Sequence, residues 1–143
     1  MPYPEKLQAV VDMFSMFDSA DRTGMLLGYA DQFREVPPGI ASRPFDTSHQ
    51  IPQCESDAYA WAFKQPDGTL KLWFAVENPS GISAKALAAI LDRTLSGLSP
   101  EEIARIDPEI VEKLFRQNIS MGKGMGLMSM VQAVQALAKA ATR

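Results

Sequence analysis

Two alternating runs joined by a tight turn restrict the possible folds of this chain more than any other feature. Residues 57–65 alternate small with large side chains, and residues 69–77 place Leu70, Leu72, Phe74 and Val76 on one face and Lys71 on the other. A period of two residues is typical of a β-strand. Between the runs, Pro66-Asp67-Gly68 favours a turn, because Gly accepts positive φ and Asp hydrogen-bonds its own backbone. The sequence therefore predicts an antiparallel hairpin.

Helical periodicity and helix start signals precede this hairpin. Apolar residues at helical spacing after Pro4 predict an amphipathic first helix, which continues to about Phe17. The capping residues of segment 18–21 predict a second helix, and Val36-Pro37-Pro38-Gly39 ends it. The stretch from there to Gln53 is rich in Pro, Ser, Thr and Asp, so we expect a long loop with at most one edge strand.

Further helices are expected after the hairpin. The pattern predicts a helix from about Ser83 to Leu95, ended by Gly97. Two strong start signals follow, Ser99-Pro100-Glu101-Glu102 and Asp107-Pro108-Glu109, and the second opens a short helix that runs to about Gln117. We expect a flexible glycine-rich segment over residues 121–126 and a final helix that begins after Gly126.

The order of the elements, with helices on both sides of a small sheet, predicts the fold class. Such an order is typical of an α+β architecture, in which helices pack on a small antiparallel β-sheet. The 143 residues fall within the size range of one domain, and the sequence has no internal repeat, so a single domain is expected over residues 1–143.

Composition and charge exclude several classes of partner. The net charge is −3 and the 14 basic residues are scattered, which argues against a nucleic-acid surface. No window approaches the ~18 uncharged apolar residues of a membrane span, so no membrane association is expected. The N-terminus lacks the pattern of a signal or transit peptide, and we expect a cytoplasmic location.

Cys54 is the only cysteine of the chain, and His49 is its only histidine. No internal disulfide can form, and a structural zinc site would need two carboxylate ligands beside these residues, so no metal site is predicted. A single cysteine is more often a small buried residue than a reactive one. A reactive thiol needs a cation or a helix N-terminus nearby to favour its thiolate, and Lys123 could supply that charge if the fold brings it close.

Two other kinds of site have weaker support. A thiol hydrolase would need His49 within hydrogen-bond reach of Cys54, together with an oxyanion hole that the sequence does not indicate. The spacing Gly122-x-Gly124-x-Gly126 lacks the full Walker pattern and does not follow a strand, which disfavours nucleotide binding.

Four segments together resemble the SufE family, in the same order and with the same spacing. They are the cysteine segment 51–56, the helix segment 85–91, the segment Gly97-Leu98-Ser99-Pro100-Glu101-Glu102-Ile103, and the segment Gly122-Lys123-Gly124-Met125-Gly126-Leu127. Gln53 stands where the family usually has Gly, and Lys123 stands where it has Arg, which keeps the charge and loses the planar fork.

The resemblance implies a SufE/IscU-like fold and a role in sulfur transfer. Cys54 would accept a persulfide sulfur from a PLP-dependent cysteine desulfurase of the SufS type and stimulate that enzyme. It would then deliver the sulfur to SufB of the SufBCD scaffold for iron–sulfur cluster assembly. Lys123 would be an electrostatic partner, and the chain would need no cofactor of its own.

Alternatives to this role remain open. The chain would act as a partner and activator of the desulfurase rather than as a stand-alone enzyme, and the sequence leaves open whether it forms a homodimer. A cluster scaffold is disfavoured because it needs several thiolate ligands. The alternative from another class is a non-catalytic module that docks on the desulfurase and keeps Cys54 buried and inert.

Overall fold

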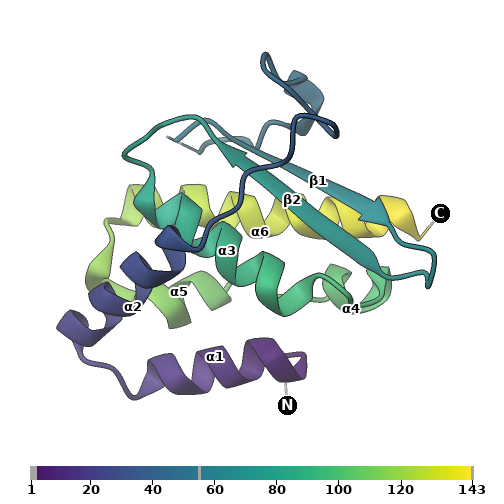
Figure 1. Cartoon of the computed structure of the whole chain (residues 1–143). Helices are drawn as coiled ribbons and strands as arrows, with labels where there is room; N and C mark the ends of the chain where they lie inside the picture. Colours follow the sequence, from purple (N-terminus) through teal and green to yellow (C-terminus); the bar gives the residue numbers. More distant parts are fainter. Residues whose placement is uncertain (1–2, 55, 143) are drawn as a thin grey trace.

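A computed structural model describes residues 3–54 and 56–142 of the chain (Figure 1). The elements follow one another as α1 (Glu5–Ser15), α2 (Ser19–Asp31), the 3-10 helix η1 (Thr47–His49), β1 (Ala58–Lys64), β2 (Leu70–Val76), α3 (Ile82–Leu95), α4 (Pro100–Ala104), α5 (Ile110–Phe115), the 3-10 helix η2 (Arg116–Asn118) and α6 (Met121–Ala141). The predicted α+β class is confirmed. None of the helices in these described ranges is long and apolar enough to cross a membrane.

The predicted hairpin is confirmed, and its register follows from the turn. Strands β1 and β2 pair antiparallel from Ala58 opposite Val76 to Lys64 opposite Leu70. The turn closes with a hydrogen bond of 2.7 Å from the Gln65 N–H to the Thr69 carbonyl, and Gly68 has a φ of 87°. Because side chains alternate along a strand, this register directs the apolar residues of β2 to one face of the sheet.

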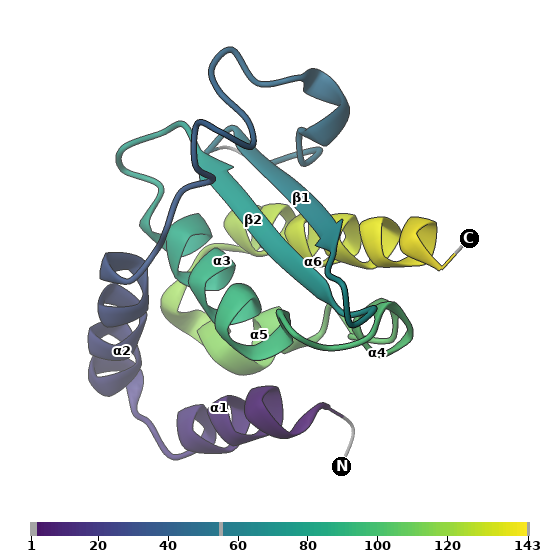
Figure 2. The same cartoon turned by 45° about the vertical axis from the view of Figure 1, so that its right-hand side comes forward.

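The inner face of the sheet packs on the two longest helices (Figures 1 and 2). Helix α3 lies against β2, and α6 lies against β1. The apolar side chains predicted for α3 are all fully buried: Leu87, Ile90, Leu91 and Leu95. Each such burial stabilises the fold by about 1.5–3 kcal/mol relative to an exposed side chain. Helices α1, α2 and α5 cover the other side of α3 and α6, which completes a layered core.

A second, smaller hydrophobic cluster covers the outer face of the sheet. Val36 and Phe45, from the loop between α2 and η1, pack against Trp61 and Ala75. Arg43 fastens the same loop, because its guanidinium bonds to the carboxylates of Glu35 and Glu77, each at 2.6 Å. In place of an edge strand, this region makes isolated bridges from Glu35 to Phe74 and from Gln50 to Tyr59.

The start of the last helix differs from the prediction. Residues 121–126 are not a flexible segment, and α6 begins at Met121 rather than after Gly126. Ser120 caps the helix, since its side chain accepts a hydrogen bond of 3.2 Å from the Lys123 N–H. Glycines within a helix cost about 1 kcal/mol each relative to alanine, but the buried face of a helix of 21 residues outweighs that cost.

Candidate functional site

Cys54 lies in a short loop whose two ends are fixed by backbone hydrogen bonds. On one side, the Ile51 N–H donates to the Ala58 carbonyl at 2.8 Å. On the other side, the Asn78 N–H donates to the Ser56 carbonyl at 3.1 Å. We call this segment, residues 51–57, the cysteine loop. The two bonds attach one of its ends to the hairpin and the other to the segment that follows β2.

Two residues of this loop have a backbone conformation that L-residues rarely adopt. Gln53 has a φ of 60° and Asp57 has a φ of 49°, and neither is a glycine. Such conformations persist only where the surrounding structure enforces them, and they occur often at functional sites. The positive φ also explains why a Gly is favoured at position 53 in the family pattern, since Gly adopts this conformation without steric cost.

The loop packs on α6 through a glycine. A Cβ atom on Gly126 would lie 3.0 Å from the carbonyl oxygen of Gln53 and 3.5 Å from the Cα of Cys54. The absence of a side chain at position 126 therefore lets the backbone of the cysteine loop rest directly on the helix. The sequence analysis expected a flexible connection here and did not predict this contact with the cysteine loop.

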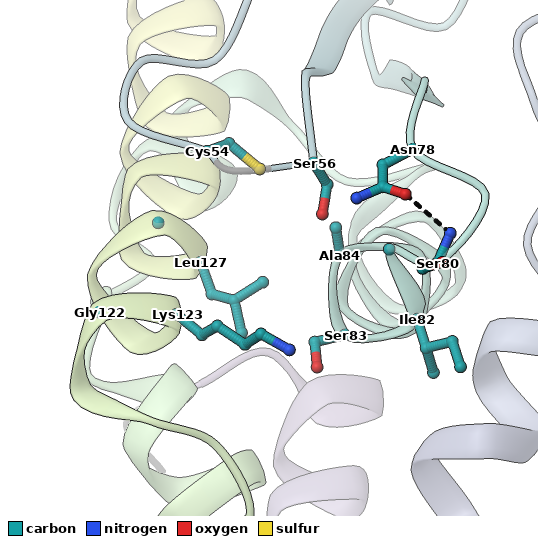
Figure 3. A pocket seen from close by; sticks show the side chains of 12 residues that line it. Cys54, Ser56, Asn78, Ser80, Ile82, Ser83, Ala84, Gly122, Lys123 and Leu127 are labelled. Atoms are coloured by element: carbon teal, nitrogen blue, oxygen red, sulfur yellow. Dashed lines mark hydrogen bonds between the residues drawn. The ribbon is translucent and has the colours of Figure 1, made fainter.

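A cavity of about 170 Å³ opens beside Cys54. Three segments distant in the sequence form its walls: the cysteine loop, the start of α3 and the first turns of α6 (Figure 3). The wall residues that bear on its chemistry are Cys54, Ser56, Asn78, Ser83, Lys123 and Leu127. The cysteine itself is partly buried, and it lines the cavity.

The fold brings together the two residues that the sequence singled out. Lys123 comes from the first turn of α6, and its side chain extends along the cavity, with its ammonium group near Ser83 (Figure 3). The Cys54 sulfur lies on the wall beside Ser56. The sequence made this meeting conditional on the fold, and their chemical roles remain predictions.

The start of α3 contributes a wall that the sequence analysis did not identify. Gly81 is the residue before the helix, and no side chain caps the first turn. Uncapped N–H groups give a helix start a partial positive charge. Ser83 adds a hydroxyl group, while the side-chain Oδ1 of Asn78 accepts a hydrogen bond of 2.9 Å from the Ser80 N–H. One sequence signal could have indicated this wall. The helix starts at Gly81-Ile82 without Ser, Thr, Asp or Asn at the capping position.

The arrangement suits a sulfur nucleophile that becomes negatively charged. The cavity wall opposite the thiol offers an ammonium group, hydroxyl groups and a helix start. Each of these stabilises an anion more than a neutral group, so the cavity favours negative charge on a sulfur group that extends into it from Cys54. Leu127 adds an apolar side chain to the lining of the same cavity.

His49 belongs to different surroundings. Its Nδ1 lies 3.1 Å from the carbonyl oxygen of Ala60, and its ring stacks on Trp61 with 5.3 Å between the centroids. It borders a separate groove between the cysteine loop and the distal part of α6. A structural role beside Trp61 therefore accounts for this histidine. Within residues 3–54 and 56–142, no three His, Cys, Asp or Glu side chains are grouped to hold a metal ion.

Comparisons with known proteins agree with this architecture. A family model described as "SufE: Fe-S metabolism associated domain" matches residues 8–138. The fold is similar to the solution structure of a hypothetical protein from Thermus thermophilus, with a TM-score of 0.77 and 25% sequence identity over 98% of both chains. No curated protein matches the chain in sequence.

Proposed function

Because the chain belongs to the SufE family, whose model covers residues 8–138, we propose that it carries sulfur for iron–sulfur cluster assembly. Cys54 accepts a sulfur atom from a PLP-dependent cysteine desulfurase of the SufS type and stimulates that enzyme. The chain then delivers the sulfur to SufB of the SufBCD scaffold. The observation that carries the proposal is the position of the only cysteine of the chain on a cavity that Lys123 also lines.

The loading step is an exchange between a thiolate and a persulfide. The Cys54 thiolate attacks the terminal sulfur of the persulfide on the desulfurase cysteine. A new S–S bond forms at Cys54, and the S–S bond of the donor breaks, so the desulfurase cysteine leaves as a thiolate. No electrons are gained or lost overall. Delivery repeats the exchange in the opposite sense, with an acceptor thiolate attacking the outer sulfur on Cys54.

The cavity gives the carrier a way to protect its cargo between the two exchanges. A persulfide reacts with other thiols when it is exposed, and Cys54 at rest is partly buried beside Leu127. To reach a partner's cysteine, the cysteine loop must move away from α6. This movement would break the close contact at Gly126 and relieve the strained backbone at the two residues with positive φ.

The surface around the cavity supports docking on a protein. Ile82, at the start of α3, keeps 45% of its surface exposed, and Met121 and Met125, on the first turns of α6, keep 86% and 58%. Large exposed apolar side chains beside a polar site are typical of contact surfaces, and methionine adapts its shape to different partners. We expect these three side chains to contact the desulfurase.

Mass spectrometry of the intact chain tests the proposal directly. Incubation with an active desulfurase and cysteine should add sulfur, and a reductant should remove it. Cys54→Ser should abolish the gain while leaving the fold intact, and Lys123→Ala should slow the transfer without stopping it. No gain of sulfur on the wild-type chain would refute the proposal. An equal loss in both variants would refute the secondary role given to Lys123.

The alternative role, a docking module with an inert cysteine, leads to a different expected result in a thiol-labelling experiment. In that role Cys54 would resist labelling by a small alkylating reagent in native buffer. As a carrier thiol that borders a cavity, it should be labelled without denaturant, and faster when the desulfurase is present. Labelling that appears only after unfolding would favour the docking module.

A further inference from the structure

The cavity beside Cys54 is larger than one transferred sulfur atom requires. Its volume is about 170 Å³. A water molecule occupies about 30 Å³ in the liquid, and a sulfur atom is of comparable size. The space in front of the thiol therefore accommodates a chain of several sulfur atoms, whereas a single persulfide sulfur would fill only the part next to the cysteine loop.

The groups that favour negative charge lie across the cavity from the cysteine. The Cys54 sulfur is on the wall beside Ser56, while the Lys123 ammonium and the Ser83 hydroxyl are on the wall formed by α6 and α3 (Figure 3). The negative charge of a polysulfide is largest at its terminal sulfur. A longer chain would bring that charge to Lys123 and Ser83, and a single persulfide would leave it near Cys54.

We propose that Cys54 carries a short polysulfide, with two or more sulfur atoms beyond Sγ, whose terminal charge is held by Lys123 and Ser83. This inference rests on the proposed sulfur-carrier function and specifies its cargo. It follows from two independent features, the size of the cavity and the position of the donors across it from the thiol.

The second loading step balances in the same way as the first. The terminal sulfur of the Cys54 persulfide attacks the terminal sulfur of a newly formed persulfide on the desulfurase. One S–S bond forms, which lengthens the chain on Cys54, and the S–S bond of the donor breaks. The desulfurase cysteine leaves as a thiolate and no oxidant is needed. The desulfurase and free cysteine, already part of the proposed function, supply every atom.

Counting sulfur atoms on the intact chain tests the proposal. The chain is loaded with a desulfurase and excess cysteine, then alkylated to trap the terminal sulfur. Since Cys54 is the only cysteine, every reductant-sensitive sulfur beyond the first belongs to a chain on that residue. Species with two or three added sulfurs support the proposal. Only a single added sulfur overturns it while leaving the carrier function intact, and no added sulfur refutes the carrier function itself.

A second loading route measures how many sulfur atoms Cys54 can hold without depending on the activity of the desulfurase. Sodium tetrasulfide transfers sulfur to a thiolate without any enzyme. The wild-type chain should retain two or more sulfurs after removal of the reagent, and Cys54→Ser should retain none. A chain that keeps only one sulfur after this treatment has no room or no stabilisation for a polysulfide, which would overturn the inference independently of any partner.

Variants on the cavity wall across from Cys54, here called the far wall, show whether the volume of the cavity or its positive charge determines how many sulfur atoms Cys54 carries. Ser83→Leu fills the cavity and should restrict Cys54 to one sulfur, whereas Ser83→Ala removes only the hydroxyl group and should still permit more. Lys123→Gln should lower the ratio of multiple to single loading by about two- to fivefold, the range of an exposed ion pair. Lys139→Gln, at the exposed far end of α6, is the matched control and should leave the ratio unchanged. Equal ratios in all four variants would overturn the assignment of the far wall.

Discussion

Replacing Gly126 by alanine, with Gly124→Ala as its matched control, tests the contact between α6 and the cysteine loop. Both glycines lie within the first two turns of α6. A Cβ at position 124 would meet only the Ile119 Cδ1, at an ordinary 3.6 Å. A Cβ at position 126 would lie 3.0 Å from the Gln53 carbonyl oxygen, so the loop would have to move by a few tenths of an ångström.

The two substitutions should change stability in opposite directions. Alanine in a helix is more stable than glycine by about 0.5–1 kcal/mol, and Gly124→Ala should gain that amount. Gly126→Ala should gain the same helix propensity but lose about 1–3 kcal/mol to overpacking against the loop. The expected difference between the variants is therefore on the order of 1–3 kcal/mol, and the net effect of Gly126→Ala is a loss.

Urea unfolding of the two variants and the wild-type chain measures this difference. Sulfur loading from a desulfurase adds a second readout, because displacement of the Gln53 carbonyl also displaces Cys54. We expect Gly124→Ala to load at the wild-type rate and Gly126→Ala to load at a changed rate. If both variants gain stability equally, the cysteine loop does not rest on α6 in solution, and the resting position of Cys54 described above is wrong.

Three further substitutions test the loop, the outer face and the core. Gln53→Gly removes the cost of a positive φ but adds freedom to the unfolded chain, so thermal unfolding should show a net gain of up to about 1 kcal/mol, and a loss would contradict a strained Gln53. The hydrogen bond from Arg43 lowers the pKa of Glu35 below its ordinary value of 4.5. The resulting stabilisation is complete above that value and is lost as the pH falls through the lower folded-state pKa. Arg43→Met should therefore lower the urea midpoint at neutral pH and have a shrinking effect in acid; an effect that is constant with pH would contradict the ion pair. Arg22→Met should cost on the order of 2–3 kcal/mol, because the buried guanidinium donates to the Phe14 carbonyl at 3.1 Å and to the Phe17 carbonyl at 2.9 Å, and methionine has no donor for either; circular dichroism against urea would detect that loss.

Local patterns predicted the elements whose signals lie within a few consecutive residues. The alternation of β1 and β2 and the turn at Gly68 gave the hairpin, and the Ser99-Pro100 signal gave α4, where the Ser99 hydroxyl accepts from the Glu102 N–H. The predicted start of α6 was wrong, because the prediction followed the low helix propensity of glycine. Ser120 is a valid cap, and tertiary packing of the helix overrides the local preference.

Only part of the candidate site could be predicted from the sequence, for a similar reason. Cys54 is recognisable as the only thiol, and the family pattern points to Lys123. The wall at Ser83 depends on how the start of α3 meets the start of α6, which are about forty residues apart in the chain. No periodicity or cap within either helix encodes that meeting. The same holds for Gly126, whose importance comes from a backbone carbonyl far away in the sequence.

The isolated bridges on either side of the hairpin determine how a partner can approach. A two-stranded sheet has two open edges, and open edges invite an incoming chain to pair with them. Here Glu35 occupies the β2 edge at Phe74, and Gln50 occupies the β1 edge at Tyr59. Both occupied positions lie in the half of the hairpin nearest the cysteine loop. An incoming polypeptide therefore cannot extend the sheet beside Cys54, and its recognition must depend on side chains rather than on strand addition.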